Sequence, residues 1–253
     1  MKAWLRLFRV VNLPTVPGDV LVGAAAVLVG SCSSGVCTTA VSSSLAPVWW
    51  AAAASVFLYA FGLADNDIVG AKTDRNRPIP DGEISFGAAR IARALCLFAA
   101  LVIASIGNLP RFWWPVAFAL ALSIVVYNRT KWSLAMGLCR ALSVVCGGAS
   151  LVTGSLRGIP GGARLLVLCV SLAWLLYVAA VTLYSSGEEV DPVKQRRVGL
   201  FVGGIVYLQL TALIVLTLEF PQVAAMRPLL VAGAVLLVLL RLFKKVFPEV
   251  SAS

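Results

Sequence analysis

Long apolar runs alternate with short polar connections along nearly the whole chain. Each run is rich in Ala, Val, Leu and Gly and is roughly 20 residues long, the length at which an α-helix crosses the hydrocarbon core of a membrane. The apolar positions are continuous and do not alternate with polar ones as they would in the strands of a membrane barrel. We therefore predict an all-α, polytopic membrane bundle. Its eight spans are expected at about residues 14–30, 47–64, 88–107, 112–127, 133–154, 164–184, 198–218 and 226–243.

Two features precede or interrupt the first run. Residues 1–13 mix three basic side chains with Trp, Leu, Phe and Val, which predicts an amphipathic segment in the headgroup layer. Asp19 lies inside the first run, seven positions after Asn12, so two helical turns would place both on a similar face. A charge within an apolar run indicates function by default, and an Asp satisfied by a nearby Arg is the structural alternative.

The longest polar stretch between two runs covers residues 64–83. It contains Asp65, Asn66, Asp67 and Asp74 beside Lys72, Arg75 and Arg77, and then turns at Pro78-Ile79-Pro80 and Asp81-Gly82. Carboxylates can hold a divalent metal while Lys and Arg hold the oxygens of a phosphorylated ligand. The stretch therefore predicts such a site at one end of the bundle. The alternative is a solvated loop whose charges keep the helices from sliding into lipid.

The polar connections after the second, fourth and sixth runs are expected on the same side of the membrane, where they can converge. The fourth run ends in Tyr127-x-x-x-Lys131. The connection over residues 185–197 holds a second set of charges, namely Glu188, Glu189, Asp191, Lys194, Arg196 and Arg197. This second acidic cluster recurs four runs after the first, which predicts a pseudo-repeat of four plus four helices in one domain over residues 1–253.

Composition narrows the function classes. The chain is 60% hydrophobic and 13% charged, with a mean hydropathy of +0.94, which excludes a water-soluble enzyme. The net charge is +10, but 17 of the 21 Lys and Arg fall in or next to connections on the N-terminal side. We therefore assign these charges to topology and predict no nucleic-acid partner. Both termini and the acidic stretches are expected in the cytoplasm.

The histidine and cysteine content of the chain limits the kinds of metal site and catalysis that it can support. Histidine is absent, which excludes a His general base and His-ligated zinc, iron or haem. Six cysteines form no C-x-x-C pair, and four of them lie in apolar runs as small hydrophobes. Cys32 and Cys37 share one connection and can form a disulfide if it faces an oxidising compartment. Any metal site must therefore use oxygen or sulfur ligands.

Three motifs together resemble the UbiA superfamily of intramembrane aromatic prenyltransferases. Asn66-Asp67, Asp74 seven residues on, and the run 77–82 (Arg-Pro-Ile-Pro-Asp-Gly) are similar to the family's N-D-x-x-D-x-x-x-D and R-P-[IL]-P-x-G motifs. Tyr127-x-x-x-Lys131 resembles its Y-x-x-x-K motif, and residues 137–148 resemble the glycine- and arginine-bearing helix that follows. The resemblance covers essentially the whole chain.

The chain also departs from the family pattern. Gly70 stands where the middle aspartate of the first motif is usual, and the second motif, usually D-x-x-x-D, reads Glu188 and Pro192. The spacing from Asp74 to Arg77 is short, and eight spans are predicted where the family typically has nine. These departures resemble divergent bacterial members, so we expect a multi-pass protein of a bacterial inner membrane.

The resemblance implies a Mg²⁺-dependent transfer from a prenyl diphosphate to a small, aromatic or lipid-like hydrophobic acceptor within the membrane. Asp67, Asp74, Tyr127 and Lys131 are the implied catalytic residues, and Mg²⁺ would be held by Asp67, Asp74, Glu188 and Asp191. Asn66, Lys72, Arg77, Lys194, Arg196, Asn12 and Asp19 are the further candidates for substrate binding. The tyrosine rings at 127 and 184 would shield an allylic carbocation.

Two other function classes compete with this interpretation. A UbiA-like carrier of a hydrophobic metabolite, without turnover, is favoured by the weakened second acidic motif at Glu188 and Pro192. A lipid-headgroup transferase of the CDP-alcohol type is disfavoured, because its D-G-x-x-A-R motif is broken after Asp81-Gly82 by Glu83-Ile84-Ser85-Phe86. Tyr127 and Arg196 also have structural alternatives, as an interfacial aromatic residue and a topological anchor. The sequence leaves the acceptor, the prenyl length and the oligomeric state open.

Overall fold

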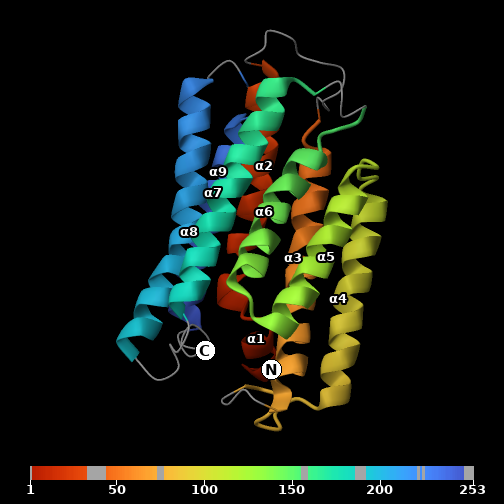
Figure 1. Ribbon diagram of the computed structural model, residues 1–253, viewed down its shortest axis with the longest axis vertical. Helices are drawn as coiled ribbons and strands as arrows, with labels where there is room; N and C mark the ends of the chain where they lie inside the picture. Colours follow the sequence, from red (N-terminus) through yellow and green to blue (C-terminus); the bar gives the residue numbers. More distant parts are fainter. Residues whose placement is uncertain are drawn as a thin grey trace.

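The computed structural model describes residues 2–32, 44–72, 77–154, 159–185, 192–220, 223 and 226–247, which form an elongated bundle of helices (Figure 1). Each of the eight predicted runs contains one long helix. In chain order the elements are α1 (Lys2–Leu7), η1 (Val10–Asn12), α2 (Thr15–Cys32), α3 (Ala46–Val69), η2 (Gly70–Lys72), α4 (Phe86–Ile106), α5 (Trp113–Thr130), α6 (Ser133–Ala149), α7 (Gly161–Ser185), α8 (Pro192–Glu219) and α9 (Met226–Val246). The all-α prediction is confirmed.

The long helices are apolar enough for a membrane. Five segments of the described chain have the length and composition needed to cross one: Val10–Ser31, Ala46–Lys72, Phe86–Ile106, Gly161–Ser185 and Arg197–Glu219. Large apolar side chains such as Ile91, Leu95 and Phe98 of α4 point outward, as expected of side chains that face lipid. How many of the eight helices cross the membrane stays a prediction.

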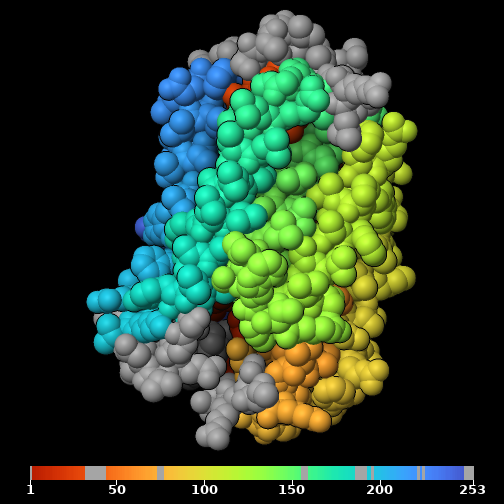
Figure 2. Space-filling model, in the orientation of Figure 1, coloured from red at the N-terminus to blue at the C-terminus, as the bar shows by residue number. Residues whose placement is uncertain are grey.

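Helix α2 forms the centre of the bundle. It contacts α3, α6, α7, α8 and α9, and its apolar segment is 89% buried. Seen from the side shown in Figure 2, α2 is almost hidden behind α6 and α7. A helix buried on all sides must be apolar all round, and α2 reads Val-Leu-Val-Gly-Ala-Ala-Ala-Val-Leu-Val over residues 20–29.

Glycines bring α2 and α6 into backbone contact. A Cβ added at Gly23 would lie 1.8 Å from the Val144 carbonyl oxygen, and one at Gly147 would lie 2.0 Å from the Val20 carbonyl oxygen. Only glycine fits at either place, because any side chain would force the two helices apart. This crossing fixes the position of α6, which carries several of the polar side chains described below.

The C-terminal ends of α3, α5 and α7 lie at one end of the bundle, the lower end in Figure 1, where α1 also lies. The described parts of the connections after α3 and α5 therefore lie close together, and the connection after α7 lies outside the described residues. Several helix boundaries differ from the prediction: α3 continues past residue 64 to Val69, α8 begins at Pro192 inside the predicted 185–197 loop, and α6 ends at Ala149, five residues before the predicted end. Asp65, Asn66 and Asp67 are thus helical and buried, because partners from other elements satisfy them.

Candidate functional site

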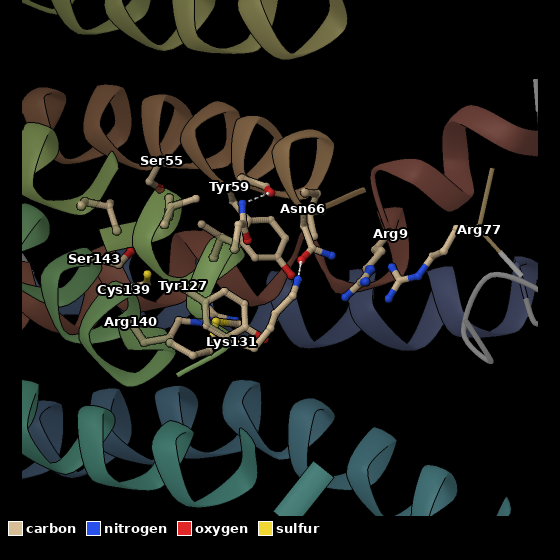
Figure 3. A pocket seen from close by; sticks show the side chains of 17 residues that line it. Arg9, Ser55, Tyr59, Asn66, Arg77, Tyr127, Lys131, Cys139, Arg140 and Ser143 are labelled. Carbon is tan, nitrogen blue, oxygen red and sulfur yellow. Dashed lines mark hydrogen bonds between the residues drawn. The ribbon is translucent and has the colours of Figure 1, made fainter. Parts of the chain in front are cut away.

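A cavity of about 280 Å³ lies between α3, α5 and α6 at the lower end of the bundle. Figure 3 shows its side chains spread along a line, with Arg9, Arg77 and Asn66 at one end and Ser55, Cys139 and Ser143 at the other. The lining comprises Arg9, Val16, Ser55, Tyr59, Gly62, Leu63, Asn66, Arg77, Leu120, Ile124, Tyr127, Asn128, Lys131, Met136, Cys139, Arg140 and Ser143. The cavity therefore has a polar region at each end and an apolar and aromatic region between them.

Three basic residues, Arg9, Arg77 and Lys131, define what we call the cationic mouth of the cavity. Lys131 donates a hydrogen bond from Nζ to the Asn66 side-chain oxygen, and the same Nζ lies 5.8 Å from the centre of the Tyr127 ring. Each basic residue of the mouth lies next to a different helix: Arg9 precedes η1, Arg77 comes after α3 and η2, and Lys131 follows α5. Three connections thus contribute one cation each.

Backbone strain accompanies two of these cations. Arg9 has a φ of 40° and Lys131 a φ of 53°, in the left-handed region that non-glycine residues rarely adopt. In the described residues only Asn108 shares this feature among non-glycine positions. Each left-handed residue turns the chain sharply beside the cavity, Arg9 just before η1 and Lys131 at the C-cap of α5. Strain of this kind is frequent at functional sites.

Carboxylates at the end of α3 lie behind the cations. The Asp67 carboxylate, only 2% exposed, accepts a hydrogen bond from Arg77 Nη1 at 3.1 Å. The Asp65 carboxylate accepts hydrogen bonds from Arg93 Nη1 at 2.8 Å and from Asn128 Nδ2 at 2.9 Å. Because these buried charges are paired across helices, α3 can continue through a stretch whose sequence is typical of a loop. Asp67 also orients Arg77 at the mouth.

The N-terminal segment is attached to this end of the bundle. Arg6 donates hydrogen bonds from Nη1 to both carboxylate oxygens of Glu83, at 2.9 and 3.0 Å, and from Nη2 to Asp81 at 3.3 Å. Leu7 is fully buried and packs with Ile84. The predicted amphipathic segment therefore lies against the Pro-rich turn, and this contact holds the chain that leads to the cationic mouth.

The structure separates the predicted site residues into three groups. Asn66, Arg77, Tyr127 and Lys131 line the cavity, and Asp67 contacts it through Arg77. Asn12, Asp19, Lys72 and Lys194 do not line it: Lys72 is exposed, Lys194 lies with Nζ 5.4 Å from the Tyr184 ring, and the Asn12 carbonyl oxygen accepts from the Thr15 hydroxyl. Asp74, Glu188, Asp191 and the Arg196 side chain lie outside the described residues, as do Cys37 and the side chain of Cys32.

Asp19 lies at the centre of a buried hydrogen-bond network. Its carboxylate accepts from Arg140 Nη1 at 2.7 Å, from Trp174 Nε1 at 2.9 Å and from Gln209 Nε2 at 2.5 Å. These three donors come from α6, α7 and α8, so one carboxylate on α2 links four helices. The Asp–Arg pairing is the structural alternative named for this residue. Of the pair, Arg140 lines the cavity and Asp19 does not.

Several lining residues were not predicted as site residues. Arg9 was assigned to topology, and Tyr59 lies inside an apolar run that carries no motif for it. Arg140 and Ser143 lie in the stretch 137–148, which resembles a helix of the family, but neither was predicted as a site residue. A basic residue directly before the first span, on the side where the polar connections converge, is the signal that points to Arg9. The other positions depend on which helix faces meet, and the sequence pattern does not specify these contacts.

Two side chains at the end of α3 carry oxygen atoms of the kind that bind Mg²⁺. Asn66 and Asp67 present amide and carboxylate oxygens, the hard ligands that Mg²⁺ prefers. Among the residues that the structure describes, no three His, Cys, Asp or Glu side chains gather into one group. The other predicted ligands, Asp74, Glu188 and Asp191, fall outside the described ranges.

Comparison with known proteins gives a fold. No family model and no curated protein matches the sequence. A solved structure of digeranylgeranylglyceryl phosphate synthase aligns over 99% of this chain and 96% of its own, with a TM-score of 0.53 and 17% identity. Two structures of a UbiA homologue from Archaeoglobus fulgidus, one bound to GPP and Mg²⁺ and one to DMAPP and Mg²⁺, align over 98% of this chain and 87% of theirs, each with a TM-score of 0.53 and 15% identity.

The bundle therefore belongs to the class of all-helical membrane folds with a polar cavity at one end. Within that class, the chain has the fold of the UbiA superfamily. The resemblance inferred from the motifs at Asn66, Arg77 and Tyr127 is confirmed at this level. Since a fold can carry several activities, the function has to be argued from the cavity itself.

Proposed function

We propose that the protein transfers a prenyl group from a prenyl diphosphate to a small hydrophobic acceptor, aromatic or lipid-like, within the membrane. The observation that carries the proposal is the cationic mouth, Arg9, Arg77 and Lys131, at one end of a cavity in a UbiA fold. Lys and Arg are the side chains that bind phosphate oxygens most strongly, and three of them meet here with the Asn66 amide. The UbiA homologues bound to GPP and to DMAPP support the same choice of donor.

The middle of the cavity suits the allylic part of the donor. Leu63, Leu120 and Ile124 supply an apolar wall, and the rings of Tyr59 and Tyr127 lie between the two ends (Figure 3). In the reaction the allylic carbon–oxygen bond breaks and pyrophosphate takes the electron pair to the cationic mouth. The acceptor's nucleophile then forms a bond to that carbon and loses a proton. The two aromatic rings stabilise the positive charge that develops on the allyl group.

Mg²⁺ is the proposed cofactor. Asp67 and Asn66 would hold it, together with Asp74, Glu188 and Asp191 from outside the described residues. When bound, the ion neutralises charge on the leaving pyrophosphate. The role of Arg77 is to bind phosphate oxygens from the position in which Asp67 holds it. Lys131 binds from the C-cap of α5, and its contact with Asn66 fixes the orientation of its ammonium group.

The first test measures binding of geranyl diphosphate to the detergent-purified protein, with and without Mg²⁺. For wild type we expect binding that Mg²⁺ strengthens, and for Asp67→Asn a loss of about tenfold or more in the presence of Mg²⁺. Glu219→Gln is the matched control, because Glu219 is an exposed acid at the end of α8 that does not line the cavity. Binding that is absent, or indifferent to both Mg²⁺ and Asp67, contradicts the proposal.

A carrier without turnover is the second candidate function. It is favoured by the second acidic motif, where Glu188 and Pro192 replace two aspartates and weaken the expected metal site. The carrier would bind geranyl diphosphate at the same mouth but release no pyrophosphate in the presence of any acceptor. Measuring pyrophosphate release by the purified protein with a panel of phenols and lipid alcohols separates the two functions.

The proposed location is a bacterial inner membrane, with membrane lipid around the bundle and both the acidic stretches and the termini in the cytoplasm. The support is the bias of Lys and Arg toward the N-terminal side and the apolar outer surface of the helices. In this orientation the cationic mouth opens where water-soluble diphosphates are made and released. The oligomeric state is open.

A further inference from the structure

The cavity has a second polar end, opposite the cationic mouth. We call it the inner end, and it consists of Ser55, Cys139, Arg140 and Ser143 (Figure 3). Ser143 is 5% exposed, and its hydroxyl has no hydrogen-bond partner among the residues that the structure describes. By contrast, the Ser55 hydroxyl donates to the Ala52 carbonyl oxygen at 2.8 Å. A buried hydroxyl that lines a cavity and lacks a partner points to a ligand that supplies one.

The inner end is polar but carries no net charge. The Arg140 guanidinium, 6% exposed, is paired with the Asp19 carboxylate at 2.7 Å. Its Nη2 also donates to the Thr15 hydroxyl at 2.7 Å, and its Nη1 to the Thr15 carbonyl oxygen at 3.2 Å. The positive charge of Arg140 is therefore neutralised by Asp19, which does not line the cavity. An anionic ligand would meet no unneutralised cation at this end.

These observations exclude two occupants of the inner end on physical grounds. An apolar prenyl tail would leave the Ser143 hydroxyl buried without a partner and would cover the Arg140–Asp19 pair with hydrocarbon. A carboxylate would lose its hydration without gaining a counter-ion. We propose that the inner end binds the acceptor, that Ser143 is its hydrogen-bonding partner, and that the acceptor is an uncharged molecule with a hydroxyl or carbonyl group. This inference rests on the proposed prenyl transfer and narrows its acceptor class.

The test uses two probes of nearly the same shape, benzamide and benzoate, titrated into the full-length protein in detergent and followed by saturation-transfer NMR. We expect benzamide to bind wild type, to remain bound when geranyl diphosphate and Mg²⁺ are added, and to bind at least about tenfold more tightly than benzoate. Ser143→Ala should weaken benzamide binding by about tenfold. Ser171→Ala is the matched control, because Ser171 is also a buried serine whose hydroxyl has no partner in the described part of the chain, but it does not line the cavity.

Four results overturn the inference: no benzamide binding to wild type, displacement of benzamide by geranyl diphosphate, benzoate binding as tight as benzamide, or equal effects of Ser143→Ala and Ser171→Ala. Asp19→Asn adds an independent check on charge, since it leaves Arg140 without its counter-ion and should shift the preference toward benzoate. If Asp19→Asn does not fold, the two probes on wild type still decide the claim about charge.

The outcome also separates this inference from the proposed function. If geranyl diphosphate fails to bind while benzamide binds in a Ser143-dependent way, the prenyl donor is wrong and the inner end stands as a site for an uncharged polar ligand. If geranyl diphosphate binds with Mg²⁺ and benzamide does not bind, the proposed function stands and the inner-end assignment falls.

Discussion

Lys131 and Lys72 are two lysines of the same end of the bundle with different surroundings. Lys131 lines the cavity and donates to Asn66, whereas Lys72 is exposed and does not line the cavity. Both follow a helix end and both were predicted to bind the diphosphate. Their positions allow the contribution of the cationic mouth to be measured with one type of substitution.

We expect Lys131→Met to weaken geranyl diphosphate binding by about 10- to 100-fold, because a charge-assisted hydrogen bond to phosphate contributes about 1.5–3 kcal/mol. Lys72→Met should change the affinity by less than about twofold, since an exposed charge is screened by water and salt. Isothermal titration in one detergent and one salt concentration measures both. Equal losses for the two variants would mean that general positive charge, and not the mouth, holds the ligand.

Some residue contacts were predictable and others were not. Tyr127 and Lys131 are four residues apart at the end of α5, a spacing visible in the sequence, and the Lys131 Nζ lies 5.8 Å from the centre of the Tyr127 ring. Lys131 is the left-handed C-cap and not part of the helix, but its backbone N–H still bonds to the Tyr127 carbonyl oxygen at 2.7 Å. The partners of Asp19 do not follow from any local pattern, because Arg140 lies 121 residues away in sequence. Arg9 enters the cavity through a left-handed backbone that no propensity predicts at an arginine.

At the scale of elements, the positions of the helices were predictable because Pro, Gly or charged residues separate each apolar run from the next. The end of α3 was not, because Asp65, Asn66 and Asp67 resemble a loop in sequence. The helix continues through them since Arg93, Asn128, Arg77 and Lys131 supply partners from elsewhere in the chain. Tertiary pairing thus overrides the local preference, and it does so where the candidate site lies.

The crossing of α2 and α6 is a second prediction at this scale. Gly147→Ala should destabilise the protein by about 1–3 kcal/mol, because its Cβ would lie 2.0 Å from the Val20 carbonyl oxygen and the helices must separate. Gly199→Ala, inside α8 with nothing within 4 Å of the added carbon, should be neutral or slightly stabilising. Thermal unfolding followed by circular dichroism compares them. If both alanines behave alike, the close approach of the two helices is not present in solution.

The Asp19 network joins α2, α6, α7 and α8, so its effect belongs to the whole molecule. Arg140→Met should destabilise the bundle by about 3–5 kcal/mol, because it leaves a fully buried carboxylate without its cation. The double variant Asp19→Asn/Arg140→Met should recover part of this loss, since the amide is neutral and can still accept from Trp174. Unfolding temperatures of the single and double variants give the comparison. A double variant that is less stable than Arg140→Met would show that the pair is not the source of the effect.

Orientation in the membrane is the remaining property of the whole molecule. The polar end of the bundle was predicted to face the cytoplasm from the distribution of Lys and Arg alone, and the C-terminal ends of α3, α5 and α7 lie together at that end (Figure 1). Asp81 lies in the turn at this end, and Asn108 follows α4 at the opposite end. A pair of cysteine substitutions at these two positions therefore reports the orientation directly.

We expect Asn108→Cys to react with a membrane-impermeant maleimide in intact cells of a bacterial host, and Asp81→Cys to react only after the cells are opened. Both variants are made in a chain with Cys32→Ser and Cys37→Ser, because Cys32 ends α2 on the same side as Asn108 and Cys37 follows it five positions later in the sequence. The opposite labelling pattern would place the cationic mouth outside the cytoplasm. In that case a diphosphate made in the cytoplasm could not reach Arg9, Arg77 and Lys131 without crossing the membrane, and the prenyl-transfer proposal would lose its donor.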